Sequence, residues 1–250
     1  FTERMEMMRD LDWLEIVEND AKDAVAIVEK LGFDMIGLSG NFAPGFERPK
    51  PITKYKWEYS ESIHEFLPES AITRTYRKEK TYEPIREDSN PSVPEPHYYV
   101  FRRVNEILKE KGIELGIFAP VYGIPVATLG SRLEWFHNNQ EGLHQYYDDC
   151  TKNVIASATK YAELGADAIG LGGDLAADMG PMISPKHYHE FIMPQIRKQA
   201  DELHKLGVFV NNTSDGDLWS ILDDFLIETH VDGFGEIDIA AGMDMARLKR

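Results

Sequence analysis

Helical periodicity alternates with short apolar runs along most of this chain. From Trp13 to Lys30, apolar side chains recur at three- and four-residue spacing, which predicts an amphipathic helix. Gly32 follows as a C-cap, and the apolar run at 33–39 then predicts a strand. Related junctions precede four further apolar runs, which predict strands near 113–119, 166–172, 207–212 and 231–236. Repeated junctions of one kind indicate repeated β–α units with parallel strands.

Two architectures are built from such units. A doubly wound sheet usually has a glycine-rich phosphate turn after its first strand, but the segment 37–40 lacks the third glycine and a following helix. We therefore predict an α/β fold of the TIM (β/α)8 barrel type. A closed barrel has eight strands, so the predicted strands account for only part of one. The chain begins with Phe1, and 243–250 look like the first turns of a helix, so we expect a fragment that lacks a first strand and the last ones.

Residues 41–97 interrupt this pattern. They are rich in proline and aromatic residues, and alternating stretches at 53–59 and 72–77 suggest a hairpin. The segment leaves the barrel at the carboxyl end of a strand, so we interpret it as a lid or partner surface, with a solvated excursion as the alternative. We expect one partial barrel domain over 1–250 with an insertion at 41–97.

Further helices are expected at 98–111 and 142–164, and another begins with Ser184 as N-cap and Pro185 as the first helical residue. A proline inside that helix, Pro194, should kink it. Histidines at 187 and 189 lie two positions apart and therefore on different helix faces, so they are poor joint metal ligands.

Polar residues gather where two of the predicted strands end. Asp174 follows the strand at 166–172, and a polar stretch from 211 to 217 follows the strand at 207–212. Parallel strands joined by a right-handed crossover bring their carboxyl ends to one edge of a sheet, where α/β enzymes hold their reacting groups. We therefore expect the site at this edge.

A turn with N-cap contacts would account for Ser214, Gly216 and Asp217 on structural grounds alone. We assign the site to the neighbouring residues: Asp174, Asp215 and Glu236 as catalytic, and Tyr122, Asn211, Asn212 and Thr213 as substrate-binding. Carboxylates that meet at a partly dry rim have raised, coupled pKa values, which suit proton donation or binding of a cationic or protonated group.

Composition limits the possible classes of function. The chain has 250 residues, of which 42% are hydrophobic and 28% charged, as in a globular protein. Its formal charge of −16 disfavours nucleic-acid binding. No apolar run approaches the roughly 18 residues of a membrane span, and no basic-then-apolar leader opens the chain. Cys150 alone cannot form an internal disulfide, so we expect a cytoplasmic location and an unreactive thiol.

Several motifs in order resemble the uroporphyrinogen decarboxylase superfamily, most densely from about residue 100 onward. They are Gly165-Ala-Asp-Ala-Ile, Gly173-Asp-Leu-Ala, Gly180-Pro-Met-Ile-Ser-Pro185, Phe191-Ile-Met-Pro194, Thr213-Ser-Asp-Gly-Asp-Leu-Trp219 and Ala241-Gly-Met-Asp244. The superfamily contains haem-pathway decarboxylases and cobalamin-dependent methyltransferases. The resemblance implies a TIM barrel with its site at the carboxyl-terminal rim.

The turns after Gly173 and Thr213 look more like the methyltransferase branch, which implies methyl transfer with a corrinoid as substrate or carried by a partner protein. Members of that branch hold zinc through a His-x-Cys pair, but here Thr213 and Asp215 occupy those positions. Threonine is a poor zinc ligand and one aspartate cannot hold the ion alone, so we expect no metal. The alternatives are a cofactor-free uroporphyrinogen decarboxylase and a non-catalytic barrel that binds a corrinoid or tetrapyrrole. The expected partners are a small tetrapyrrole or methyl acceptor, and no nucleic acid or membrane.

Overall fold

The computed structural model describes residues 2–11, 13–38, 48–59, 62–77, 98–121, 123–126 and 129–249. The chain forms two compact units: the first contains 1–83 and 94–115, and the second contains 84–93 and 116–250. Among the described helices, none combines the length and the apolar content that crossing a bilayer requires.

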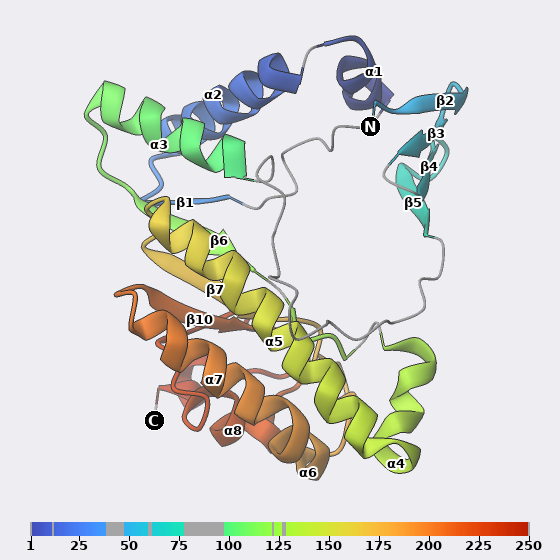
Figure 1. Cartoon of the computed structure of the whole chain (residues 1–250), viewed down its shortest axis with the longest axis vertical. Coiled ribbons are helices and arrows are strands. Elements are labelled where there is room, and N and C mark those ends of the chain that lie inside the picture. The colour runs from blue at the N-terminus through green and yellow to red at the C-terminus, as the bar shows by residue number, and fades with distance from the viewer. Residues whose placement is uncertain are drawn as a thin grey trace. The chain divides into compact units, whose positions relative to one another are not determined.

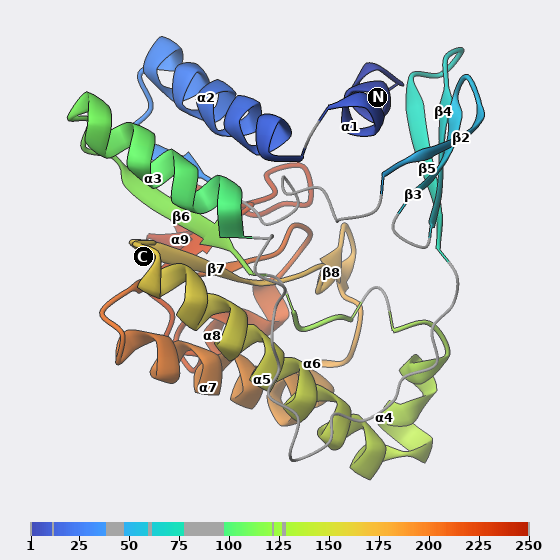
Figure 2. The same ribbon diagram turned by 45° about the horizontal axis from the view of Figure 1, so that its top comes forward.

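The first unit contains a pair of long helices and a separate small sheet (Figure 2). Its elements are α1 (Thr2–Asp10), α2 (Trp13–Leu31), β1 (Met35–Gly37), β2 (Lys50–Thr53), β3 (Lys56–Tyr59), β4 (Ser62–Leu67), β5 (Ile72–Arg77) and α3 (Tyr99–Lys111). Helices α2 and α3 pack through buried aliphatic side chains such as Val25 and Val104. Arg103 of α3 bonds Glu18 of α2 at 2.6 Å at the edge of this contact. Helix α2 confirms the amphipathic periodicity of 13–30, and α3 confirms the helix expected at 98–111.

Strands β2 to β5 form an antiparallel sheet in chain order. The sequence suggested that 53–59 and 72–77 pair as a hairpin, but β4 lies between them: Trp57 pairs with His64, and His64 pairs with Thr75. Over 62–67 the polar pair His64-Glu65 is followed by the apolar pair Phe66-Leu67, so this strand lacks regular alternation and was missed. The lid role of 41–97 stays a prediction, and 41–47, 60–61 and 78–97 lie outside the described residues.

The second unit carries the repeated β–α elements. They are β6 (Gly116–Pro120), α4 (Trp135–Asn138), α5 (Gln140–Glu163), β7 (Ala168–Gly172), β8 (Ala176–Ala177), β9 (Gly180–Pro181), α6 (Pro185–His187), α7 (Met193–His204), β10 (Phe209–Thr213), α8 (Leu222–Leu226), β11 (Gly233–Gly235) and α9 (Met245–Leu248). Strands β6, β7, β10 and β11 are neighbours in that order, and each pair is parallel. Each of the predicted strands, including that at 33–39, is present within a few residues of its expected bounds.

Helices α5 and α7 lie side by side over one face of β7 and β10 (Figure 1). A buried hydrogen bond of 3.0 Å from Gln199 Nε2 to Thr151 Oγ1 joins them. On the strands, Ile169, Leu171 and Val210 are fully buried. Parallel strands with their crossover helices on the outside give the fold class that the junctions predicted, an incomplete (β/α)8 barrel.

The helix that begins after Ser184 is divided rather than simply kinked. Ser184 Oγ accepts from the N–H of His187 at 3.2 Å, as expected of an N-cap. A π-turn over 188–192 then separates α6 from α7. The cause is Pro194, which has no N–H to offer the carbonyl of residue 190. His187 stacks on Phe136, whereas His189 bonds Asp224 at 3.0 Å, so the two histidines have different neighbours.

Candidate functional site

Three neighbouring strands of the second unit end at one level. Thr213, the last residue of β10, is the register partner of Gly172 at the end of β7 and of Gly235 at the end of β11. The residues that follow these ends therefore leave the sheet together. Gly172 has φ +100°, and a Cβ there would lie 2.2 Å from the carbonyl oxygen of Thr213, so only glycine fits this close approach.

The carboxylates predicted as catalytic follow these strand ends. Asp174 and Asp215 each lie two residues beyond a strand, and Glu236 follows β11 directly; all are exposed. Although Glu236 is exposed as a residue, its carboxyl group loses part of its hydration; this loss is the larger cause that raises its pKa, and the negative charges of Asp215 and Asp174 raise it further. Glu236 also has φ +63°, in the left-handed region that side chains other than glycine rarely adopt. The charges of Asp174 and Asp215 thus both act on the Glu236 carboxyl group.

Asn211 and Thr213 lie on one face of β10. A Cβ on Gly235 would come within 2.8 Å of Thr213 Cγ2 and 2.9 Å of Asn211 Nδ2, so glycine in β11 leaves room for both side chains. Thr213 Oγ1 donates a hydrogen bond of 2.7 Å to the carbonyl oxygen of Leu171. The threonine hydroxyl therefore ties β10 to β7 directly below the carboxylates.

Asn212 occupies the opposite face, which differs from the expectation that it lies beside Asn211 and Thr213. Its side chain is 0% exposed, and Nδ2 donates to the carbonyl oxygen of Phe225 at 2.9 Å. The reason is the two-residue period of a strand, which cannot turn three successive side chains to one side. Tyr122, the remaining predicted site residue, lies outside the part of the chain that the structure describes.

The turn after β10 has the structural contacts expected of Gly216 and Asp217. Asp217 Oδ1 accepts from the N–H of Trp219 at 3.0 Å, and the Asp217 N–H donates to the carbonyl oxygen of Ala177 at 3.0 Å. Gly216 has φ +81°, and a Cβ on it would lie 2.7 Å from the carbonyl carbon of Ala176. The turn therefore holds the β8–β9 hairpin, which sequence reasoning missed although Gly180-Pro181 is a turn signal.

The donor set at this rim does not fit zinc. Within the described part of the chain, no three His, Cys, Asp or Glu side chains are grouped so that they could hold a metal ion. Thr213 is a neutral hydroxyl already bonded to Leu171, and Asp215 alone offers one carboxylate. Cys150 is not a candidate nucleophile either, because burial raises the pKa of its thiol to about 11.

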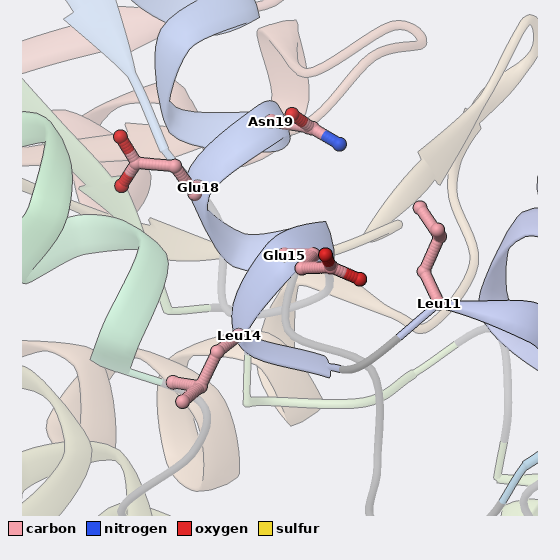
Figure 3. Close-up of a pocket in the computed structure, with 5 residues that line it drawn as sticks. All are labelled: Leu11, Leu14, Glu15, Glu18 and Asn19. Atoms are coloured by element: carbon pink, nitrogen blue, oxygen red, sulfur yellow. The ribbon is translucent and has the colours of Figure 1, made fainter.

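Two pockets are lined by other residues. One, of about 350 Å³, belongs to the first unit and is lined by Leu11, Leu14, Glu15, Glu18 and Asn19 (Figure 3). The Glu18 carboxylate is already engaged, since hydrogen bonds from Arg103 and then Lys22 lower its pKa to about 2. The other, of about 400 Å³, lies before α8, where the guanidinium of Arg247 stacks on the Trp219 ring at 3.7 Å. Sequence reasoning missed this stack, because the spacing of the two residues carries no signal.

Comparison with known proteins places the chain in a family. The model of the family described as uroporphyrinogen decarboxylase (URO-D) matches residues 118–247, just over half of the chain. The chain belongs to the URO-D family, and the match contains Asp174, Asp215 and Glu236. No curated protein matches the sequence significantly.

One solved structure supports the fold. A methyltransferase from Methanosarcina mazei superposes with a TM-score of 0.58 and 20% identity, over 94% of this chain and 67% of that chain. A xylose isomerase-like TIM barrel protein from Mycobacterium smegmatis, solved with magnesium, gives a TM-score of 0.35 and 13% identity, over 92% of this chain and 57% of that chain. The first similarity supports the incomplete barrel over the doubly wound alternative.

Proposed function

We propose that this chain forms part of a corrinoid-linked, methyltransferase-type enzyme of the URO-D family. The observation that carries the proposal is the group of carboxylates from Asp174, Asp215 and Glu236 at aligned strand ends. The family match supports an enzyme of this superfamily, and the similar fold of the Methanosarcina mazei methyltransferase makes methyl transfer the first reaction to test.

Glu236 is the residue suited to move a proton. Partial burial and the charges of Asp215 and Asp174 raise its pKa, so more of it is protonated at a given pH than of an ordinary glutamate. A raised pKa also makes the ionised carboxylate a stronger base, so Glu236 would accept the proton that a thiol or a folate nitrogen releases on taking the methyl group, a role worth about 10²–10⁴ in rate. The carboxylates of Asp174 and Asp215 then hold the protonated or cationic group in place.

Apolar side chains near these residues suit a large flat ligand. Met179, in the β8–β9 hairpin after Asp174, is 96% exposed, and Ile239, in the loop after Glu236, is 75% exposed. Such side chains would hold one face of a corrinoid ring by apolar contact. When bound, a corrinoid would supply the cobalt centre that carries the methyl group. No step is assigned to zinc, because the donors at the rim do not fit it.

The second candidate is decarboxylation of uroporphyrinogen, which the description of the matching family model favours. The same protonated carboxyl group would then deliver a proton to the carbon that loses carbon dioxide. A third possibility is a barrel that binds a corrinoid or tetrapyrrole without turnover. It differs from the other two because binding would not depend on the protonation of Glu236.

The test uses the full-length protein in two assays. One follows methyl transfer from methylcobalamin to a thiol or folate, and the other follows stepwise loss of carboxylates from uroporphyrinogen. We expect activity in the first, reduced by about 10²–10⁴ in Glu236→Gln. Asp201→Asn is the matched control, because Asp201 is an exposed carboxylate paired with His230.

Activity in the uroporphyrinogen assay alone would assign the protein to the decarboxylase branch. No activity in either assay would contradict both the methyltransferase and the decarboxylase hypotheses. If corrinoid binding also survives Asp174→Asn and Asp215→Asn, the protein is a binding barrel.

A further inference from the structure

A single buried hydroxyl connects the two segments that carry Asp174 and Asp215. Ser214 is 1% exposed. Its Oγ accepts from the N–H of Leu175 at 3.1 Å and donates to the carbonyl oxygen of Asp215 at 2.9 Å. Leu175 directly follows Asp174, so this hydroxyl bonds the backbone beside one carboxylate and the backbone of the other. From the sequence, Ser214 was expected to serve only a local turn, but it reaches across to the loop after β7.

Between the loop after β7 and the turn after β10, Ser214 makes a contact through its side chain, whereas its neighbours make theirs through the main chain. On one side, the N–H of Gly173 donates to the carbonyl oxygen of Thr213 at 3.1 Å. On the other, Gly216 lies against the backbone of Ala176 with no space for a Cβ. These contacts are made by the main chain and follow from the strand ends themselves. The Ser214 bond is made by a side chain that substitution can remove.

We propose that Ser214 is a positioning residue that fixes the separation between the two backbone segments that carry Asp174 and Asp215. The proposal deepens the proposed function and rests on it for any effect on catalysis. Both hydrogen-bonding capacities of the hydroxyl are satisfied in a buried place, so its removal leaves the Leu175 N–H without its partner. The loop after β7 then relaxes to hydrate that N–H, and Asp174 moves relative to Asp215.

Glu236 reports this movement without any assay of activity. Its pKa depends on the charges of both aspartates, so a displaced aspartate changes it. The experiment titrates the Glu236 side-chain carboxyl by ¹³C NMR in the wild type, in Ser214→Ala and in Thr229→Val. Thr229 is the matched control because its hydroxyl is also buried and hydrogen-bonded. The residue is 0% exposed, and its Oγ1 donates one hydrogen bond of 2.8 Å to the carbonyl oxygen of Phe225.

We expect the pKa of Glu236 to move toward its ordinary value in Ser214→Ala and to stay at the wild-type value in Thr229→Val. Ser214→Thr keeps the hydroxyl and should restore the wild-type titration. Where turnover is found, the pH at half-maximal rate should shift in the same direction in Ser214→Ala. No activity in either assay would overturn the proposed function. The titration of Glu236 would still decide whether Ser214 has the positioning role.

An unchanged Glu236 pKa in Ser214→Ala would overturn the positioning role. So would an equal shift in Thr229→Val, because the effect would then be a general response to losing a buried hydroxyl. If Ser214→Ala does not fold, Ser214→Cys serves in its place, since a thiol keeps a similar volume but is a weaker donor and acceptor. For Ser214→Cys too, an unchanged Glu236 pKa or an equal shift in Thr229→Val would overturn the positioning role.

Discussion

Asp167 and Ile117 are joined by two reciprocal hydrogen bonds across neighbouring strands. The Asp167 N–H donates to the carbonyl oxygen of Ile117 at 2.8 Å, and Asp167 Oδ2 accepts from the Ile117 N–H at 2.8 Å. Asp167 immediately precedes β7, so the carboxylate lies at the amino-terminal end of the sheet, opposite the candidate site. The Asp167 carboxylate accepts a hydrogen bond from the Ile117 N–H, which has no backbone acceptor in β7.

Asp232 and Val210 repeat this arrangement before β11. The Asp232 N–H donates to the carbonyl oxygen of Val210 at 2.7 Å, and Asp232 Oδ2 accepts from the Val210 N–H at 2.7 Å. Burial acts to raise the pKa of Asp232, but the Val210 N–H and His204 together outweigh it and keep the pKa below its ordinary value. The aspartate that recurs in the helix-to-strand junctions therefore has a structural role.

Asp167→Ala should lower the free energy of unfolding by about 1–3 kcal/mol, because it leaves the N–H of Ile117 without its acceptor. Urea unfolding followed by circular dichroism measures the change. Asp201→Asn, at an exposed position, should change stability by less than about 0.5 kcal/mol. Equal effects of the two substitutions would contradict the role assigned to Asp167.

Arg103→Met should destabilise the first unit at neutral pH, and the effect should disappear in acid. Hydrogen bonds from Arg103 and Lys22 lower the folded-state pKa of Glu18 from 4.5 to about 2. A lowered pKa stabilises the folded state above the unfolded-state value, and this contribution is lost as the pH falls through the folded-state value. Urea midpoints for the wild type and the variant should therefore converge between pH 4.5 and about 2. A difference that is constant with pH would exclude the ion pair as its source.

Protein purified without chelators should contain no stoichiometric zinc, because Thr213 is a poor zinc ligand and Asp215 alone cannot hold the ion. Elemental analysis by mass spectrometry measures the metal content. One equivalent of zinc that disappears in a Thr213→Ala, Asp215→Ala double variant would show that these positions bind it after all.

The parallel strands could be predicted because local signals mark each junction. A helix often ends at a glycine because the residue there adopts positive φ, as Gly32 and Gly112 do. The apolar run that follows the glycine marks the next strand. The same reasoning placed Asp174, Asp215 and Glu236 at one edge, because parallel strands bring their carboxyl ends together. What these signals cannot give is the face to which each side chain points, and Asn212 was misplaced for that reason.

Long-range contacts also lay beyond the sequence. Ser214 gives no sign that its hydroxyl bonds Leu175, because the partner is 39 residues away. Strand β4 was overlooked for a different reason: its sequence has two polar and then two apolar residues over 64–67, so it lacks the alternation that marks a strand. The π-turn before α7 arises from Pro194, yet the sequence indicates only that the helix is disturbed and not which backbone geometry relieves the disturbance.

The central claim is that Asp174, Asp215 and Glu236 act as one carboxylate group, and the titration of Glu236 tests it most directly. The measurement compares the ¹³C-detected pKa of Glu236 in the wild type and in an Asp174→Asn, Asp215→Asn double variant. We predict a wild-type pKa above the ordinary glutamate value and a lower pKa in the double variant, because only the contribution of burial then remains. An ordinary pKa in the wild type, or the same pKa in both proteins, would contradict the claim.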